Sequence, residues 1–105
     1  MFNINKVNIV YLDCGITDLR KSIDELTMIV QDEIKLAPFD NVSFVFYNKQ
    51  MNKLKILHFE EGFWLYYYRL EHGHLKWPQN PEKVFKVNNE KLKWLLKGYE
   101  VRTIS

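Results

Sequence analysis

Residues Gly62 to Pro78 read G-F-W-L-Y-Y-Y-R-L-E-H-G-H-L-K-W-P. Aromatic and aliphatic side chains predominate from Phe63 to Leu70 and again from Leu75 to Trp77. These residue types favour β-strands, and Gly73 between the two runs marks a turn, so the stretch predicts two extended segments. It also sets aromatic rings beside cations, a combination that can contact a polyanion or anchor a protein partner.

The aromatic run must divide its rings between two faces of a sheet, because successive side chains of a strand point in opposite directions. Phe63, Leu65 and Tyr67 fall on one face, and the residues between them fall on the other. Either both faces are covered by other parts of the domain, or one face stays exposed as an aromatic binding surface.

Two further strands precede this stretch. Ser43 to Tyr47 and Lys53 to Phe59 are rich in aromatic and aliphatic residues, and the polar segment Asn48 to Asn52 between them predicts a hairpin loop. Connections this short join antiparallel neighbours. Pro78 and Pro81 then end the ladder, because proline has no N–H to donate.

The N-terminal part predicts a strand followed by a helix. Val7 to Leu12 forms the strand, and Asp13-Cys14-Gly15 ends it. Thr17 or Asp18 can then cap a helix that ends before Pro38. Five apolar residues at helical spacing are expected to be buried together: Leu19, Ile23, Leu26, Val30 and Ile34.

A second helix is predicted near the C-terminus. Asn88 can cap it, Gly98 can end it, and residues 99–104 are compatible with a last short strand. Its apolar residues are Leu92, Leu95 and Leu96. The predicted fold is therefore α+β, one domain over residues 1–105, with the order β-α-β-β-β-β-α. We expect an antiparallel meander sheet with both helices on one face.

The composition is that of a folded domain, with 105 residues, 47% hydrophobic and 27% charged. A formal net charge of +2 does not indicate nucleic-acid binding by itself, so a basic surface would depend on where the cations lie. The single cysteine, Cys14, excludes an intrachain disulfide. Together with the lack of a signal peptide, this favours a reducing cytoplasm, so we expect a cytoplasmic protein. No apolar run reaches the roughly 18 residues of a membrane-spanning helix.

Five segments carry a combined motif. They are T-D-L-R-K-S-I-D-E-L (17–26), F-V-F (44–46), L-K-I-L (54–57), G-F-W-L-Y-Y-Y-R-L-E (62–71) and K-W-P (76–78). Together they resemble the TnpB-type accessory proteins of insertion-sequence elements, in the insertion sequence sixty-six family. The resemblance covers nearly the whole chain. It implies a bacterial mobile-element protein that is encoded beside a larger transposase and assists transposition.

Two features depart from the pattern of that family. The loop from Asn48 to Asn52 holds only Lys49 where family members tend to carry several arginines. His72 and His74 also stand where the family tends to have arginine. Both changes lower the permanent positive charge of this chain.

The candidate binding residues are cations and aromatic rings. The expected polyanion contacts are Arg20, Lys21, Lys53, Lys55, Arg69 and Lys76, and the expected aromatic anchors are Tyr67 and Trp77. Alternation along the strands predicts that Lys53, Lys55 and Arg69 lie on one side of the sheet. The hypothesis is an accessory protein that binds element DNA, the transposase and other element proteins, or both. The alternative is a protein-interaction adaptor that never touches DNA.

Catalysis is not expected. The carboxylates are scattered along predicted helix surfaces, and His72 and His74 have no evident metal-binding partner other than Glu71. We therefore predict no catalytic residue, no metal and no cofactor. A small metal-dependent nuclease remains the third and least favoured alternative.

Overall fold

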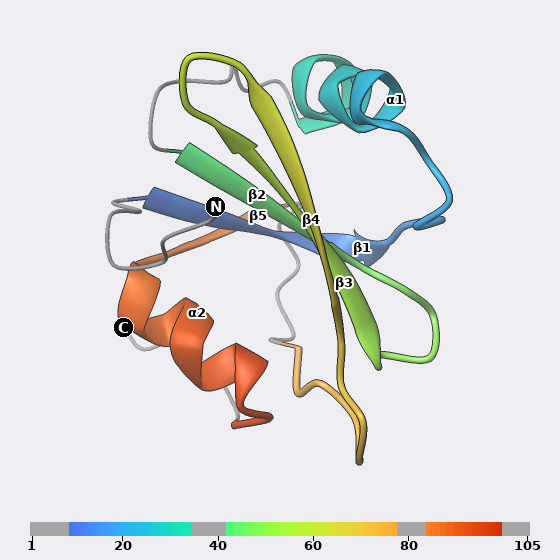
Figure 1. The fold of residues 1–105 in the computed structure, drawn as a ribbon, viewed down its shortest axis with the longest axis vertical. Helices are drawn as coiled ribbons and strands as arrows, with labels where there is room; N and C mark the ends of the chain where they lie inside the picture. Colours follow the sequence, from blue (N-terminus) through green and yellow to red (C-terminus); the bar gives the residue numbers. More distant parts are fainter. Residues whose placement is uncertain (1–8, 35–41, 78–83, 100–105) are drawn as a thin grey trace.

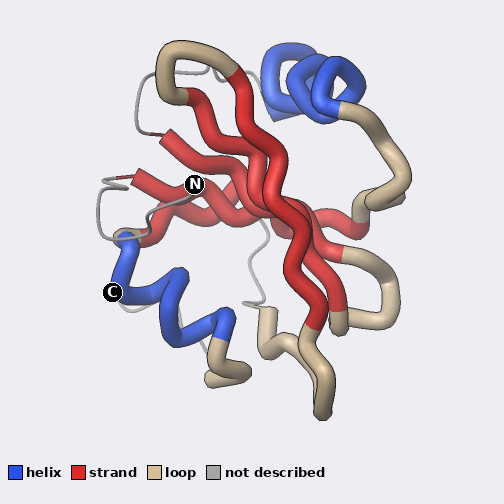
Figure 2. The backbone as a smooth tube through the Cα atoms, in the orientation of Figure 1, coloured by secondary structure: helices blue, strands red, loops and turns tan. Residues whose placement is uncertain are grey.

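The computed structural model describes residues 9–34, 42–77 and 84–99. In these parts, five strands form one sheet in the order β4-β3-β2-β1-β5, with helices packed against it (Figures 1 and 2). The elements are β1 (Ile9–Ile16), α1 (Ile23–Met28), a π-helical segment η2 (Ile29–Ile34), β2 (Val42–Tyr47), β3 (Lys53–Phe59), β4 (Phe63–Arg69), β5 (Val84–Val87) and α2 (Asn89–Leu96). The predicted α+β class and element order are confirmed.

The sheet combines a meander with one parallel pair. Strands β2, β3 and β4 are successive antiparallel neighbours, as the sequence predicts. Strand β1 instead runs parallel to β2, because the chain crosses over through α1 and η2 between them. Strand β5 pairs antiparallel with the other side of β1, so β4 and β5 are the edges of the sheet.

The last strand lies at Val84–Val87, and the prediction of a strand at Leu75–Trp77 is wrong. Leu75 and Trp77 are buried against one face of the sheet instead. The indole N–H of Trp77 donates to the carbonyl of Asp13 at 2.7 Å. The alternating apolar pattern therefore belongs to a covering segment that contributes to the core without joining the ladder.

Each face of the sheet is covered by a different helical segment (Figure 1). Leu26 and Val30, from α1 and η2, pack on one face, here called the α1 face. Leu92 and Leu95 of α2 pack on the other, the α2 face. The expectation that both helices lie on one face is therefore wrong. The reason is that every residue of β2 is buried, so both of its faces need a cover.

Strand β1 continues past the point where the sequence predicts a break. Asp13 still pairs with Val84 of β5, and the strand runs on to Ile16. The register with β2 shifts between Leu12 and Ile16, as in a β-bulge. This irregularity accommodates the polar residues without ending the strand.

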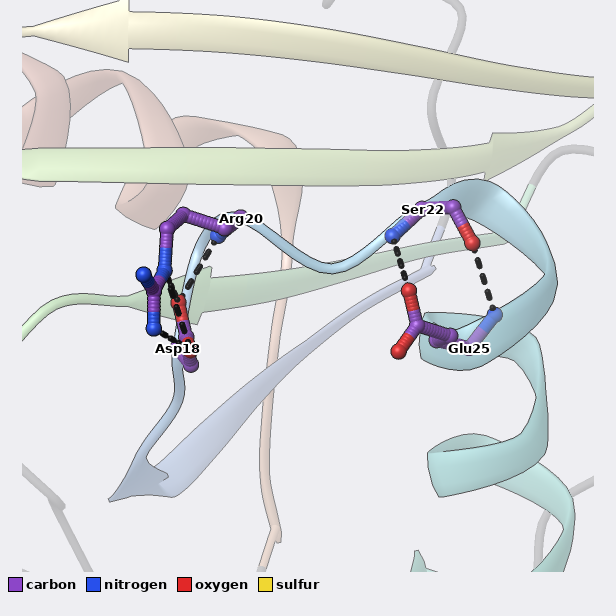
Figure 3. Close-up of polar contacts among 4 residues, drawn as sticks. All are labelled: Asp18, Arg20, Ser22 and Glu25. Atoms are coloured by element: carbon purple, nitrogen blue, oxygen red, sulfur yellow. Dashed lines mark hydrogen bonds and ion pairs between the residues drawn. The ribbon is translucent and has the colours of Figure 1, made fainter.

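Helix α1 begins at Ile23, later than the predicted caps at Thr17 or Asp18. Ser22 is the N-cap, and its hydroxyl accepts a hydrogen bond from the N–H of Glu25 at 3.3 Å. The Glu25 carboxylate in turn accepts from the N–H of Ser22 at 3.0 Å, which completes a capping box (Figure 3). The N–H of Ser22 lowers the pKa of the Glu25 carboxyl, because it stabilises the charged form.

Thr17 has other partners, which explains why it does not cap the helix. Its N–H donates to the carbonyl of Tyr47 at 3.0 Å, and its hydroxyl donates to the Asp13 carboxylate at 3.0 Å. The predicted apolar stripe is otherwise largely confirmed. Leu26 and Val30 are buried, and Leu19 and Ile23 are half-buried beside them. The side chain of Ile34 lies outside the described part.

The predictions for α2 and for the first hairpin are confirmed. The side chain of Asn88 accepts from the N–H of Lys91 at 2.9 Å, and Gly98 follows the helix with φ 86°. In the loop between β2 and β3, the Asn48 side chain accepts from the N–H groups of Asn52 and Lys53. The expected strand over residues 99–104 falls almost entirely outside the described residues.

We predict that Leu26→Ala lowers the free energy of unfolding by about 2–5 kcal/mol, because Leu26 is fully buried on the α1 face. Chemical denaturation measures the change. Met28→Ala, at an exposed position of the same helix, is the matched control and should cost less than about 1 kcal/mol. Equal losses for the two variants would contradict the described packing.

Candidate binding surface

Strands β3 and β4 bring four of the candidate residues together. Lys53 is the cross-strand partner of Arg69, and Lys55 is the partner of Tyr67. Directly paired residues of an antiparallel ladder project from the same face, so all four side chains lie on the α1 side of the sheet. The prediction that Lys53, Lys55 and Arg69 share a side is therefore confirmed.

Lys21 joins this group through the backbone. The Nζ of Lys55 donates to the carbonyl of Lys21 at 3.4 Å, which links β3 to the segment that leads into α1. The bond uses a neutral acceptor, so Lys55 keeps its net charge. We call the set Lys21, Lys53, Lys55, Tyr67 and Arg69 the basic–aromatic face.

The members of this face differ in exposure. Tyr67 is 56% exposed, and the Arg69 side chain is 57% exposed. The three lysines are half-buried, as expected when an aliphatic stem lies along the protein and the ammonium group reaches water. Arg69 also forms an exposed ion pair with Glu71 at 3.2 Å, so part of its charge is neutralised locally.

Arg20 is held by its own neighbour in the turn before α1. The Asp18 carboxylate accepts from the backbone N–H, Nε and Nη2 of Arg20, the last at 2.8 Å (Figure 3). These hydrogen bonds hold the pKa of the Asp18 carboxyl far below its usual range. The pair is close to neutral as a unit. Arg20 lies before α1 begins, so its ion-pair partner is a neighbour in the turn.

Trp77 does not belong to an exposed surface, and its role as a binding anchor is not supported. It is 6% exposed, packs on the α2 face and lies 4.3 Å, ring centre to ring centre, from Tyr47. Lys76 is exposed between the buried Leu75 and Trp77. Its segment covers the α2 side, so Lys76 is separated by the sheet from the basic–aromatic face.

One polar cluster, built on a buried Ser–His pair, was not anticipated from the sequence. The hydroxyl of Ser43 and Nδ1 of His58 lie 2.8 Å apart on paired strands, and Nε2 of His58 lies 3.5 Å from Glu60 Oε2. The residue types match a hydrolytic triad. However, Ser43 is 0% exposed, so no substrate reaches its hydroxyl. The cluster satisfies polar groups inside the sheet, and only the strand register could have revealed it.

The other candidate chemistry is unremarkable in the described ranges. There, no three His, Cys, Asp or Glu side chains gather as a metal-binding group. His72 and His74 are exposed, and Nδ1 of His74 lies 3.0 Å from the carbonyl of Gln50. The expectations of no metal, no cofactor and no catalysis remain predictions. Among the helices of these same ranges, none is long and apolar enough to cross a membrane.

The structure is a small α+β domain that carries basic and aromatic side chains on one side of its sheet. The chain belongs to the family described as IS66 Orf2 like protein, whose model matches residues 8–105. It is therefore an accessory protein of an insertion sequence, as the motifs indicated. A protein of Sinorhizobium fredii (strain NBRC 101917 / NGR234), named Uncharacterized protein y4hO, is 31% identical over 94 residues, which cover 89% of this chain and 82% of that protein. No solved structure matches the chain.

The reassignment of Trp77 gives a direct test. We predict that Trp77→Ala lowers the free energy of unfolding by about 3–5 kcal/mol, because it empties a core position. Tyr67→Ala, which removes an exposed ring, should change it by less than about 1 kcal/mol. Thermal and chemical unfolding of both variants measure the difference. A fully stable Trp77→Ala protein would contradict the core assignment.

Proposed function

We propose that this protein assists transposition by binding the backbone of the element's DNA through the basic–aromatic face. The observation that carries the proposal is the pairing of Lys53 with Arg69 and of Lys55 with Tyr67 on one side of β3 and β4. Ammonium and guanidinium groups bind phosphates, and an exposed tyrosine ring can stack on a base or pack against a sugar.

The charges on this face support the proposal. Among the described residues, no carboxylate lies within ion-pair distance of Lys21, Lys53 or Lys55. The positive charges of Lys53 and Lys55 are therefore available to an external anion, whereas Lys21 also lies near enough to Asp18 and Glu25 to stabilise their charged forms. With a net charge of only +2 for the whole chain, the binding energy must come from this local arrangement.

Contacts with phosphates give an affinity that depends steeply on salt. If each of the three lysines of this face neutralises one phosphate, the slope is about −3 in a plot of log K against log salt concentration, since each neutralised phosphate contributes about −0.9. We predict this slope for wild-type protein and duplex DNA from the element ends, measured by fluorescence anisotropy. Replacing Lys53 and Lys55 by Gln together should reduce the slope by about 2.

Lys76→Gln is the matched control, because it removes a lysine from the opposite side of the sheet and should leave the slope unchanged. Equal effects of the two replacements would show that the contact is not confined to the proposed face. Absence of binding at any salt concentration would rule out the DNA contact. The remaining hypothesis would then be a protein-interaction adaptor that contacts only the transposase. The exposed rings of Phe63, Trp64 and Tyr67 favour this alternative.

We expect the isolated chain to have no nuclease or strand-transfer activity. Asp18 is engaged by Arg20, and Asp24 and Asp32 are exposed on the helical segment, so these carboxylates are solvated rather than gathered around metal ions. Incubation with element-end DNA and magnesium or manganese should give no nicked or joined product. Metal-dependent cleavage that is abolished by Asn at one of the three positions would contradict this expectation.

A further inference from the structure

The β4 strand is an edge of the sheet, and within the described residues no strand pairs with its outer side (Figure 2). It reads F-W-L-Y-Y-Y-R, with no proline, glycine or lysine. Natural edge strands are normally protected by such residues, by bulges or by a covering element, because free backbone groups invite another strand. A seven-residue edge of high β-propensity is therefore open to pairing.

The phase of the backbone shows which groups face outward. The N–H of Leu70 donates to the carbonyl of Asn52 at 2.8 Å, so Leu70 turns its backbone toward β3. Backbone direction alternates along an antiparallel strand. The N–H and C=O groups of Phe63, Leu65, Tyr67 and Arg69 therefore point away from β3, toward the open side.

The outward N–H and C=O groups of one β4 strand can pair with the same groups of a second copy. If a second β4 lies antiparallel to the first, Phe63 of each copy pairs with Arg69 of the other and Leu65 pairs with Tyr67. Every outward donor then meets an outward acceptor, and a two-fold axis passes by Tyr66. Such a contact is isologous and closes as a dimer, so it does not propagate into a fibre.

The placement of the rings agrees with the antiparallel direction. Antiparallel pairing sets Arg69 of each copy opposite Phe63 of the other, within reach of a cation–π contact. Trp64, which is 48% exposed, meets Tyr68 of the second copy on the α2 side. A parallel arrangement would instead bring like charges together.

We propose that the protein forms a symmetric homodimer through antiparallel pairing of two β4 strands. The dimer joins two five-stranded sheets into one continuous sheet. Its two-fold axis is perpendicular to the sheet, so the basic–aromatic faces of both copies lie on the same side and next to each other. The dimer follows from the edge itself and does not depend on DNA binding.

Sedimentation analysis over a wide concentration range tests the dimer, with an expected mass of twice 12.7 kDa. Tyr67→Pro removes one outward N–H that makes no bond within the sheet, and should give a folded monomer. Tyr67→Thr is the matched control, because it removes the same ring but keeps the N–H and should remain dimeric. Circular dichroism reports whether each variant is folded.

A wild-type monomer at every concentration, or a dimer that survives Tyr67→Pro, would overturn the inference. A dimer that binds no DNA would overturn only the proposed function.

Discussion

Strand β2 is buried along its whole length, and the rest of the molecule follows from the need to cover it on both sides. The crossover through α1 and η2 covers one face and makes β1 parallel to β2. Helix α2 and the segment with Leu75 and Trp77 cover the other. These covers are short, so β4 at the edge keeps several aromatic side chains in contact with solvent. The core of the domain and its candidate binding surface are thus two results of one constraint.

The parts of the fold that depend on local rules could be predicted from the sequence. Alternation along β3 and β4 correctly placed Lys53, Lys55 and Arg69 on one side, because side-chain direction in a strand has a period of two. The Asn88 cap and Gly98 were also predictable, since both act on backbone groups a few residues away. The contact between the Lys21 carbonyl and Lys55 brings Lys21 to this group, and no sequence spacing reveals it.

The errors concern partners that are distant in sequence. Leu75 and Trp77 have the alternation of a strand, but burial of alternate residues needs only a surface to pack on and does not require a ladder. The prediction of a helix cap at Thr17 was wrong because the N–H of Thr17 bonds to the carbonyl of Tyr47 in the sheet. The residues next to Thr17 in the sequence give no sign of this distant partner. Ser43 and His58 likewise meet only through the register of β2 and β3.

The pairing of β1 with β5 also has a consequence for how the chain folds. Val10 and Val87 are partners although they lie near opposite ends of the chain. Closing such a large loop costs conformational entropy before any contact is gained, and topologies of this kind fold slowly. During synthesis, β1 can pair with β2 long before β5 leaves the ribosome. Until then β1 is itself an unpaired edge, so completion of the C-terminal segment removes a site of misassembly in the nascent protein.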